Sequence, residues 1–470
     1  MEKSTNIPDT DRLKLQILRS HVLTQIGEYD RGLKLAEQLI RDTESLENLL
    51  LEVDAHISFA SALVASGKLN ECLDAIENGK KMLTTVKDIQ QFEIAERSAT
   101  LNHITGIVHR KKGNLGLALA YLQQSLSIRK DLGNLHEIAE SISIIGNINA
   151  SKGNLDLALE NFHESVAIFE ELGDQPPISK LLNNIGFIYW QKGDFARALD
   201  NYHKSLGMFQ KQGNNLHLAI SLQNIGLLYW QKSDFNLALD YFKSSLALFE
   251  ELNRKSEIGA VYNNIGNIYE DKGELDLALE YHQMSSTIRQ ELENKQELAT
   301  SLNNIGHVHL SKGNFGIATE YFKKSLKLFE ETRNNLDISH PLFNLVRVTI
   351  EKGSVEEARS YLTRLEMINS NEDNKLIDLF YRFAKAKVLK ASDRIIQKAE
   401  AQQIFKQIVE EEVIKLNLSV DALINLCELL LLEFRNTGNE EILNELTILL
   451  NQLLEYAKTL NSHLWLVYLY

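Results

Sequence analysis

The chain has 470 residues, a net charge of −14 at pH 7 and only four prolines. Its 44% hydrophobic fraction and its many Leu, Ala, Glu and Lys residues are typical of a folded, strongly helical protein and not of a disordered one. The acidic residues are scattered along the chain instead of forming one block, which disfavours nonspecific attraction to nucleic acid. We therefore expect an all-α protein with no nucleic-acid partner.

The cysteine count and the hydropathy pattern narrow the class further. Cys72 and Cys427 are the only cysteines, which excludes a disulfide framework and a cysteine-based zinc site and suits a reducing compartment. Residues 1–11 form a polar segment without the apolar core of a secretory signal, and no run of about eighteen uncharged apolar residues suggests a membrane span. We expect a cytoplasmic protein with no membrane partner and no metal.

In chain order, the predicted elements repeat with a period of forty residues. A turn glycine at Gly27 recurs at Gly67 and then at Gly113, a step that is six residues too long and places extra residues near 87–96. Within the repeats a second glycine recurs every forty residues, at Gly106, Gly146, Gly186, Gly226, Gly266 and Gly306. A repeat of this length predicts a solenoid of helix pairs.

Residues 179–218 show one unit most clearly. A first apolar stripe with helical spacing contains Gly186, and a second stripe contains Ala198. Between them, Gly193 suits a left-handed turn and Asp194 can cap the second helix. We expect Gly186 and Ala198 to lie where the two helices approach most closely, because a larger side chain would hold the axes apart.

These columns resemble the tetratricopeptide repeat, which places Gly and Tyr in a first helix and Ala and an aromatic residue in a second. The residues that carry the resemblance are Gly186, Tyr189, Ala198 and Tyr202; Gly226, Tyr229, Ala238 and Phe242; Gly266, Tyr269, Ala278 and His282. The unit is longer than the common 34-residue form and is similar to the arrays of kinesin light chain, Pins-type adaptors and Rap-type regulators. The resemblance implies a right-handed α-solenoid of antiparallel helix pairs.

The repeat pattern also divides the chain. We expect about nine helix pairs over residues 12–368, a polar break at 369–375 and degenerate helical pairs over 376–470. The sequence ends on the apolar run 464–470. Either this run folds back as a terminal helix, or it belongs to a further repeat of a longer protein, which we favour because a solenoid normally closes with a polar face.

One side of each first helix is the candidate binding surface, because in tetratricopeptide arrays the equivalent face lines a concave groove that binds peptides. We expect the groove to change chemistry along its length, from a basic end at Arg110 and Lys111 through an apolar and aromatic middle to a polar and acidic later part. The candidate residues are Asn183, Asn184, Phe187 and Trp190; Gln223, Asn224, Leu227 and Trp230; Asn263, Asn264, Asn267 and Glu270; Asn303, Asn304 and His307.

Two features of this surface have open alternatives. Asparagine is a poor helix former, so its return in register at Asn184, Asn224, Asn264, Asn304 and Asn344 suggests that the amides are used. They either contact a ligand or bond a neighbouring repeat. Trp190 and Trp230 share a column and are candidate anchors for a partner, or they pack between successive first helices.

The strong catalytic motifs, among them the P-loop, HExxH and GxSxG, are missing from the sequence. We therefore expect no enzyme and no cofactor. The favoured function is a scaffold or adaptor that holds a peptide segment or helix of a partner protein in the groove. The alternative is a ligand-sensing or peptide-sensing regulatory arm of a larger signalling protein. The oligomeric state is open.

Overall fold

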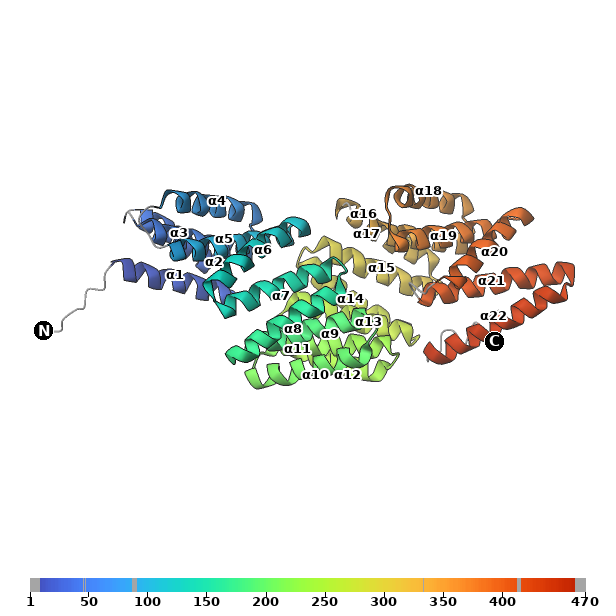
Figure 1. Ribbon diagram of the computed structural model, residues 1–470. Coiled ribbons are helices and arrows are strands. Elements are labelled where there is room, and N and C mark those ends of the chain that lie inside the picture. The colour runs from blue at the N-terminus through green and yellow to red at the C-terminus, as the bar shows by residue number, and fades with distance from the viewer. Residues whose placement is uncertain are drawn as a thin grey trace. The chain divides into compact units, whose positions relative to one another are not determined.

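The computed structural model describes residues 9–44, 46, 48–86, 91–332, 334–411 and 416–460. Within these ranges the chain forms 22 α-helices and no strand (Figure 1), so the all-α prediction is confirmed. The chain divides into two compact units, residues 1–217 and 218–470. None of the described helices is long and apolar enough to cross a membrane.

The helices of the first unit, with α11 crossing into the second, are α1 (Asp9–Gln25), α2 (Tyr29–Glu44), α3 (Leu49–Ala65), α4 (Leu69–Thr85), α5 (Gln91–Lys111), α6 (Leu115–Leu132), α7 (Leu135–Ser151), α8 (Leu155–Leu172), α9 (Gln175–Gln191), α10 (Phe195–Gln212) and α11 (Asn215–Gln231). Those of the second unit are α12 (Phe235–Glu251), α13 (Lys255–Asp271), α14 (Leu275–Glu291), α15 (Lys295–Ser311), α16 (Phe315–Thr332), α17 (Asn335–Glu351), α18 (Val355–Asn371), α19 (Lys375–Lys390), α20 (Ile395–Glu410), α21 (Leu416–Thr437) and α22 (Glu440–Leu460).

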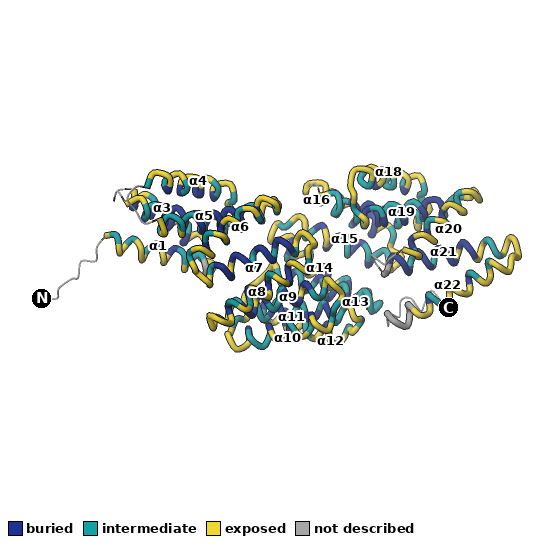
Figure 2. The backbone as a smooth tube through the Cα atoms, in the orientation of Figure 1, coloured by how far each residue is buried: buried dark blue, intermediate teal, exposed yellow. Residues whose placement is uncertain are grey.

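Within each unit, a first helix packs against the second helix that follows it, and the second helix packs against the next first helix. The buried sides of these helices meet inside each stack, and exposed positions follow the outer sides (Figure 2). The turns inside the pairs form as the sequence predicts. Gly193 adopts φ 76°, and the Asp194 side chain accepts a hydrogen bond from the backbone N–H of Arg197 at 3.0 Å.

The repeating helix glycines lie at the closest approach of each pair, as predicted. A Cβ atom added at Gly186 would lie 2.8 Å from the Tyr202 ring and 3.2 Å from the backbone oxygen of Ala198. A methyl group has no room at such distances. The same contact recurs in all six repeats that carry the helix glycine. In each of them the side chain sixteen positions later faces the glycine; these side chains are Leu122, Phe162, Tyr202, Phe242, His282 and Phe322.

A repeating hydrogen bond also joins the two helices of these pairs. On the six second helices α6, α8, α10, α12, α14 and α16, a buried serine donates a hydrogen bond of 2.7–2.8 Å to a backbone carbonyl of the preceding first helix, 26 residues earlier. The pairs are Ser125–Ala99, Ser165–Ala139, Ser205–Ser179, Ser245–Ala219, Ser285–Gly259 and Ser325–Ala299. The bond satisfies the serine hydroxyl in the buried interior, where water is not available to do so.

The helix boundaries refine the sequence-based segments. Helix α1 already begins at Asp9, where Asp9 and Asp11 occupy a first turn that favours negative charge. Helix α5 has 21 residues against 17 in α3, so part of the insertion near 87–96 lengthens the start of this helix. Helix α18 continues to Asn371, which leaves 372–374 between helices. The apolar run 464–470 lies outside the described residues.

The glycine contacts generate a prediction with a control inside the same unit. An added Cβ would lie 2.7 Å from the Phe322 ring at Gly306 but 3.3 Å from the Phe242 ring at Gly226. Replacing a helical Gly by Ala gains about 1 kcal/mol of helix propensity, whereas overpacking costs about 1–3 kcal/mol. We expect Gly306→Ala to lower Tm in scanning calorimetry, and Gly226→Ala to leave it unchanged or raise it. Equal losses from both would contradict the close-approach account.

Candidate functional site

The candidate residues lie on the first helices of four successive repeats. Helix α9 carries the first four, α11 the next four, α13 the four from Asn263 to Glu270, and α15 the last three. We call this side of each first helix its first-helix face, and we describe the face of α9, in the first unit, separately from those of α11, α13 and α15 in the second. It exists because each first helix buries a different side, the one that contains the repeating glycine, against its partner.

In the first unit the first-helix face of α9 presents two aromatic side chains. The rings of Phe187 and Trp190 lie 5.4 Å apart, centroid to centroid, and are tilted by 45°. Phe187 is 40% exposed, although a phenylalanine would normally be buried. One turn before it, the Asn184 amide donates to the Asn147 side-chain oxygen on α7 at 3.2 Å. The face therefore combines an open aromatic side chain with an amide that bridges two repeats.

In the second unit the asparagines bond one another across the repeats. The Asn304 amide donates to the side-chain oxygens of Asn263, at 2.9 Å, and Asn267, at 3.4 Å. The Asn344 amide donates to the Asn303 oxygen at 3.1 Å. Three of the repeating asparagines, Asn184, Asn304 and Asn344, thus form the bonds between repeats that the sequence left open. Contact of these asparagines with a ligand stays a prediction.

The later part of the face holds a chain of ionisable groups between α11 and α15. The Trp230 indole N–H donates to an Asp271 oxygen at 2.6 Å, so this tryptophan packs against the next first helix. Beside it, the Glu270 carboxylate is hydrogen-bonded to the His307 ring of the following repeat. The polar and acidic side chains that the sequence predicts at this end therefore form bonds between neighbouring repeats.

A buried histidine lies behind this chain. His282 fills the aromatic position opposite Gly266; it is fully buried, and neither ring nitrogen has a hydrogen-bond partner. Its Nε2 atom is 4.0 Å from a Glu270 oxygen. Burial lowers the pKa of His282 to about 4, with Glu270 acting in the opposite direction and His307 and Arg289 lowering it further. The ring is therefore neutral at neutral pH.

The two carboxyl groups are shifted in opposite directions. Burial raises the pKa of Asp271 to about 6, against the opposing Trp230 hydrogen bond, and the neighbouring Glu270 charge adds to the rise. Burial also acts to raise the pKa of Glu270, but the charge and hydrogen bond of His307, with His282 and Arg347 nearby, hold it below its ordinary value. Two adjacent carboxyl groups thus keep distinct protonation behaviour because their partners differ.

Sequence reasoning missed two parts of this region. His282 occupies the position where most repeats have an aromatic residue, but the repeat pattern does not predict that Glu270 lies beside it. Arg347 forms an ion pair with Asp421 at 3.1 Å, and Asp421 lies where the forty-residue pattern has faded. Among the side chains that the structure describes, no group of three or more His, Cys, Asp or Glu residues could hold a metal ion.

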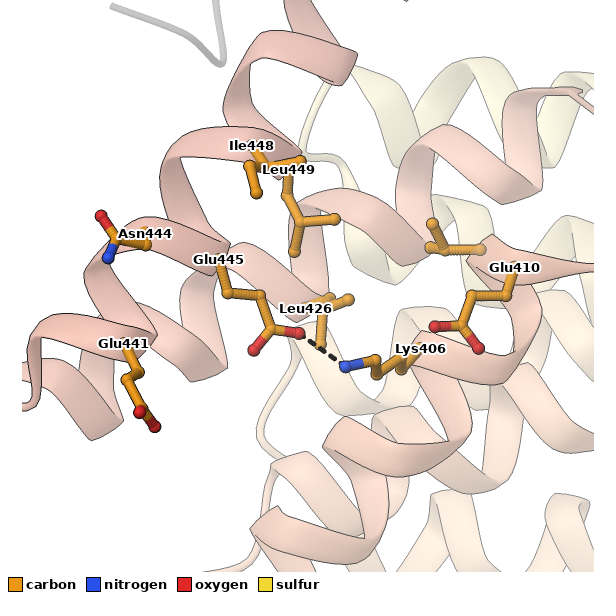
Figure 3. A pocket seen from close by; sticks show the side chains of 9 residues that line it. Lys406, Glu410, Leu426, Glu441, Asn444, Glu445, Ile448 and Leu449 are labelled. Carbon is orange, nitrogen blue, oxygen red and sulfur yellow. Dashed lines mark hydrogen bonds and ion pairs between the residues drawn. The ribbon is translucent and has the colours of Figure 1, made fainter.

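A separate open pocket of about 460 Å³ lies among α20, α21 and α22 (Figure 3). Its apolar lining includes Leu426, Ile448 and Leu449, and the ion pair of Lys406 with Glu445, at 2.7 Å, lies at its side. None of the candidate residues contributes to it. The pocket is therefore distinct from the first-helix face.

Comparisons with known proteins place these repeats in a family. Residues 177–251 and 257–331 match the family model described as tetratricopeptide repeat. No protein of the curated set matches the chain. The fold is similar to that of the apo quorum sensor NprR from B. thuringiensis, with 14% identity and a TM-score of 0.57 over 76% of this chain and 99% of that one.

Two further solved structures share the fold. A Rap protein complexed with competence and sporulation factor has 17% identity and a TM-score of 0.54 over 77% of this chain and 98% of that one. A signal transduction ATPase with a tetratricopeptide repeat sensor, from Pyrococcus horikoshii, has 16% identity and a TM-score of 0.53 over 68% of this chain and 47% of that one. At these identities the similarity extends to the fold.

The buried His282 predicts a specific acid sensitivity. Its pKa is about 4 in the folded protein and about 6.5 when unfolded, so the unfolded chain binds more protons between these values. Folding is thereby weakened as pH falls from 6.5 to 4, by up to about 3 kcal/mol. We expect His282→Phe, which restores the ring found in other repeats, to lose less Tm between pH 7 and pH 4.5 than the natural chain.

The reciprocal change is the control. Phe322 faces Gly306 as His282 faces Gly266, so Phe322→His should add acid sensitivity. The raised pKa of Asp271 changes the folding stability in the opposite direction. Because the folded state holds this proton more tightly than the unfolded chain, the protein gains stability from Asp271 as pH falls through about 6. We expect this contribution to be common to the variants and to cancel from the comparison. Identical Tm losses in all three proteins would contradict the role given to His282.

Proposed function

We propose that this chain, whose residues 177–251 and 257–331 match the tetratricopeptide repeat model, is a non-catalytic scaffold that binds a peptide segment or a helix of a partner protein along its first-helix face. The observation that carries the proposal is the open aromatic side chain of Phe187 beside Trp190. Large aromatic side chains on a surface that also offers amides are typical anchors for a protein partner. The proposed site contains the residues from Asn183 to His307 named above.

Two kinds of interaction support this reading. An exposed aromatic ring gains free energy when a partner covers it, because apolar area leaves water at about 25 cal/mol per Å². Side-chain amides supply both a donor and an acceptor, which suits the N–H and C=O groups of a peptide backbone. Phe187 and Trp190 would thus provide affinity, while asparagines such as Asn184 would fix the position of the backbone.

The alternative function is a regulatory arm that senses a peptide or another ligand for a larger signalling protein. What favours it is the fold shared with a quorum sensor and with a Rap protein bound to competence and sporulation factor. The hydrogen bonds between repeats, such as Asn304 to Asn263 at 2.9 Å, offer a way to transmit binding. A ligand that exchanged these bonds would change how neighbouring repeats pack.

The aromatic anchor is tested with a peptide library and two matched variants. Phe187→Ala with Trp190→Ala should weaken binding of selected peptides by tenfold or more, which corresponds to about 1.4 kcal/mol. Leu157→Ala removes an exposed apolar side chain from α8, a second helix of the same unit, and should leave affinity unchanged. Isothermal titration calorimetry gives the affinities, and circular dichroism checks the fold. Undiminished binding by a folded double variant would exclude this anchor.

Solution scattering separates the two functions. A rigid scaffold should keep its radius of gyration when a selected peptide saturates it, because the repeats keep their packing. A sensor should change its radius of gyration, since binding would alter the repeat-to-repeat contacts. A change seen with the natural chain but not with the Phe187→Ala, Trp190→Ala variant would support sensing through this face, and constant dimensions would contradict it.

A further inference from the structure

The Glu270 carboxylate at the end of α13 has one oxygen without a hydrogen-bond partner. Its Oε1 atom is bonded to the His307 ring, whereas the described residues offer Oε2 only the His282 Nε2 atom at 4.0 Å, which is too long for a hydrogen bond. The side chain is 15% exposed, and Oε2 is not a fully buried atom. A free carboxylate oxygen therefore reaches the surface of the first-helix face of α13.

The ring behind this oxygen also lacks partners. His282 is completely buried, neither of its nitrogens has a hydrogen-bond partner, and its Nε2 atom is directed at Glu270. Buried polar atoms are nearly always satisfied in native proteins, so an incomplete network of this kind points to a further group that the chain itself does not supply. Because His282 lies too deep to meet another molecule, Glu270 Oε2 is the atom that a ligand would contact.

The balance of charge determines the sign of the missing group. The charges that act on Glu270 and Asp271 come from each other, from His307 and Arg347, and from the buried histidine, which is neutral at neutral pH. Arg347 already pairs with Asp421 at 3.1 Å. Three carboxyl groups thus share one guanidinium, and a protonated His307 would still leave one negative charge in excess. The group that completes the network is therefore a cation.

The surroundings favour an organic cation over a metal ion. In the part of the chain that the structure describes, no three His, Cys, Asp or Glu side chains are placed to hold a metal. An ammonium or guanidinium group needs only a carboxylate oxygen to accept its N–H, and an aromatic ring nearby adds to the attraction. The Trp230 indole, bonded to Asp271 at 2.6 Å, lies beside the carboxyl groups. A bound cation would also favour the ionised form of Asp271, whose pKa burial raises to about 6.

We propose that Glu270 and Asp271 bind a cationic group of the peptide, an ammonium or a guanidinium that donates a hydrogen bond to Glu270 Oε2. A lysine side chain, an arginine side chain and a free peptide N-terminus all supply this chemistry. The inference rests on the proposed function, because it requires a peptide on the faces of α11, α13 and α15. It adds selectivity, since complementary charge discriminates between partners more than it raises affinity.

A double-mutant cycle between peptide and protein tests the proposal. A synthetic library of random ten-residue peptides, with free or acetylated N-termini, is screened against the natural chain. Selected peptides are made again with lysine replaced by norleucine, arginine by citrulline, or the N-terminus acetylated. Removing the charge that meets Glu270 should weaken binding to the natural chain by about tenfold or more, and binding to Glu270→Gln by less than about twofold. Isothermal titration calorimetry gives the affinities.

The variants are chosen to leave the contacts between repeats in place. Glutamine at position 270 keeps an oxygen for the His307 ring. Glu280→Gln removes the same charge from an exposed position on α14, a second helix of the same unit, and should show the full charge effect of the natural chain. The three peptide replacements identify the source of the cation, because only the one that removes the bound group weakens binding.

Each contrary result has a separate meaning. Selected peptides whose affinity for the natural chain does not depend on their charge overturn this proposal and leave the proposed function intact. Equal charge effects in the natural chain and Glu270→Gln place the cation elsewhere and overturn it as well, whereas a failure of every peptide to bind contradicts both. Where Glu270→Gln fails to fold by circular dichroism, Asp271→Asn takes its place, and the charge effect should fall below that of the natural chain.

Discussion

The contact between a helix glycine and the side chain sixteen residues later is the constraint on which the helix pairs from α5–α6 to α15–α16 depend. At Gly186 the Tyr202 ring occupies the place where a Cβ atom would stand, so the two helices approach more closely than any larger residue permits. The buried serine bond, Ser205 to the Ser179 carbonyl at 2.8 Å, joins the same helices about one turn further along. Steric fit and a directional bond together fix how one helix lies on the other, and the repeat reproduces both.

Because packing is fixed on one side of each first helix, the opposite side is free to vary in chemistry. The column that holds Phe187 contains Asn147 in the repeat before it and His307 three repeats later, with no change in the helix pairs. The ring position is less free. His282 fills the space of a phenylalanine, but it introduces a titrating group beside Glu270, so this substitution affects stability through pH while preserving shape.

The sequence predicts those features that depend on local conformation or on the repeat period. Gly193 and Asp194 form the expected turn and cap, and Ser233 takes the same left-handed conformation, at φ 60°, where the neighbouring repeats have glycine. Partner choice is different, because it depends on which side chain of another repeat lies within reach. The Asn184 amide bonds Asn147, and the Asn304 amide bonds Asn267 at the equivalent position but also Asn263. The repeat that contains Asn147 has Ser143 where Asn263 stands, so the second bond depends on a residue outside the asparagine column.

These amide bonds also limit what a peptide can gain on the first-helix face. A peptide carbonyl that accepts from the Asn304 amide nitrogen must displace Asn263 or Asn267, so one hydrogen bond replaces another and the net gain falls below the roughly 1 kcal/mol of a typical new bond. Covering Phe187 displaces only water and gains the full apolar contribution. Affinity should therefore concentrate at the aromatic pair, while the asparagines determine the register in which a backbone can lie, since only some positions exchange their bonds without loss.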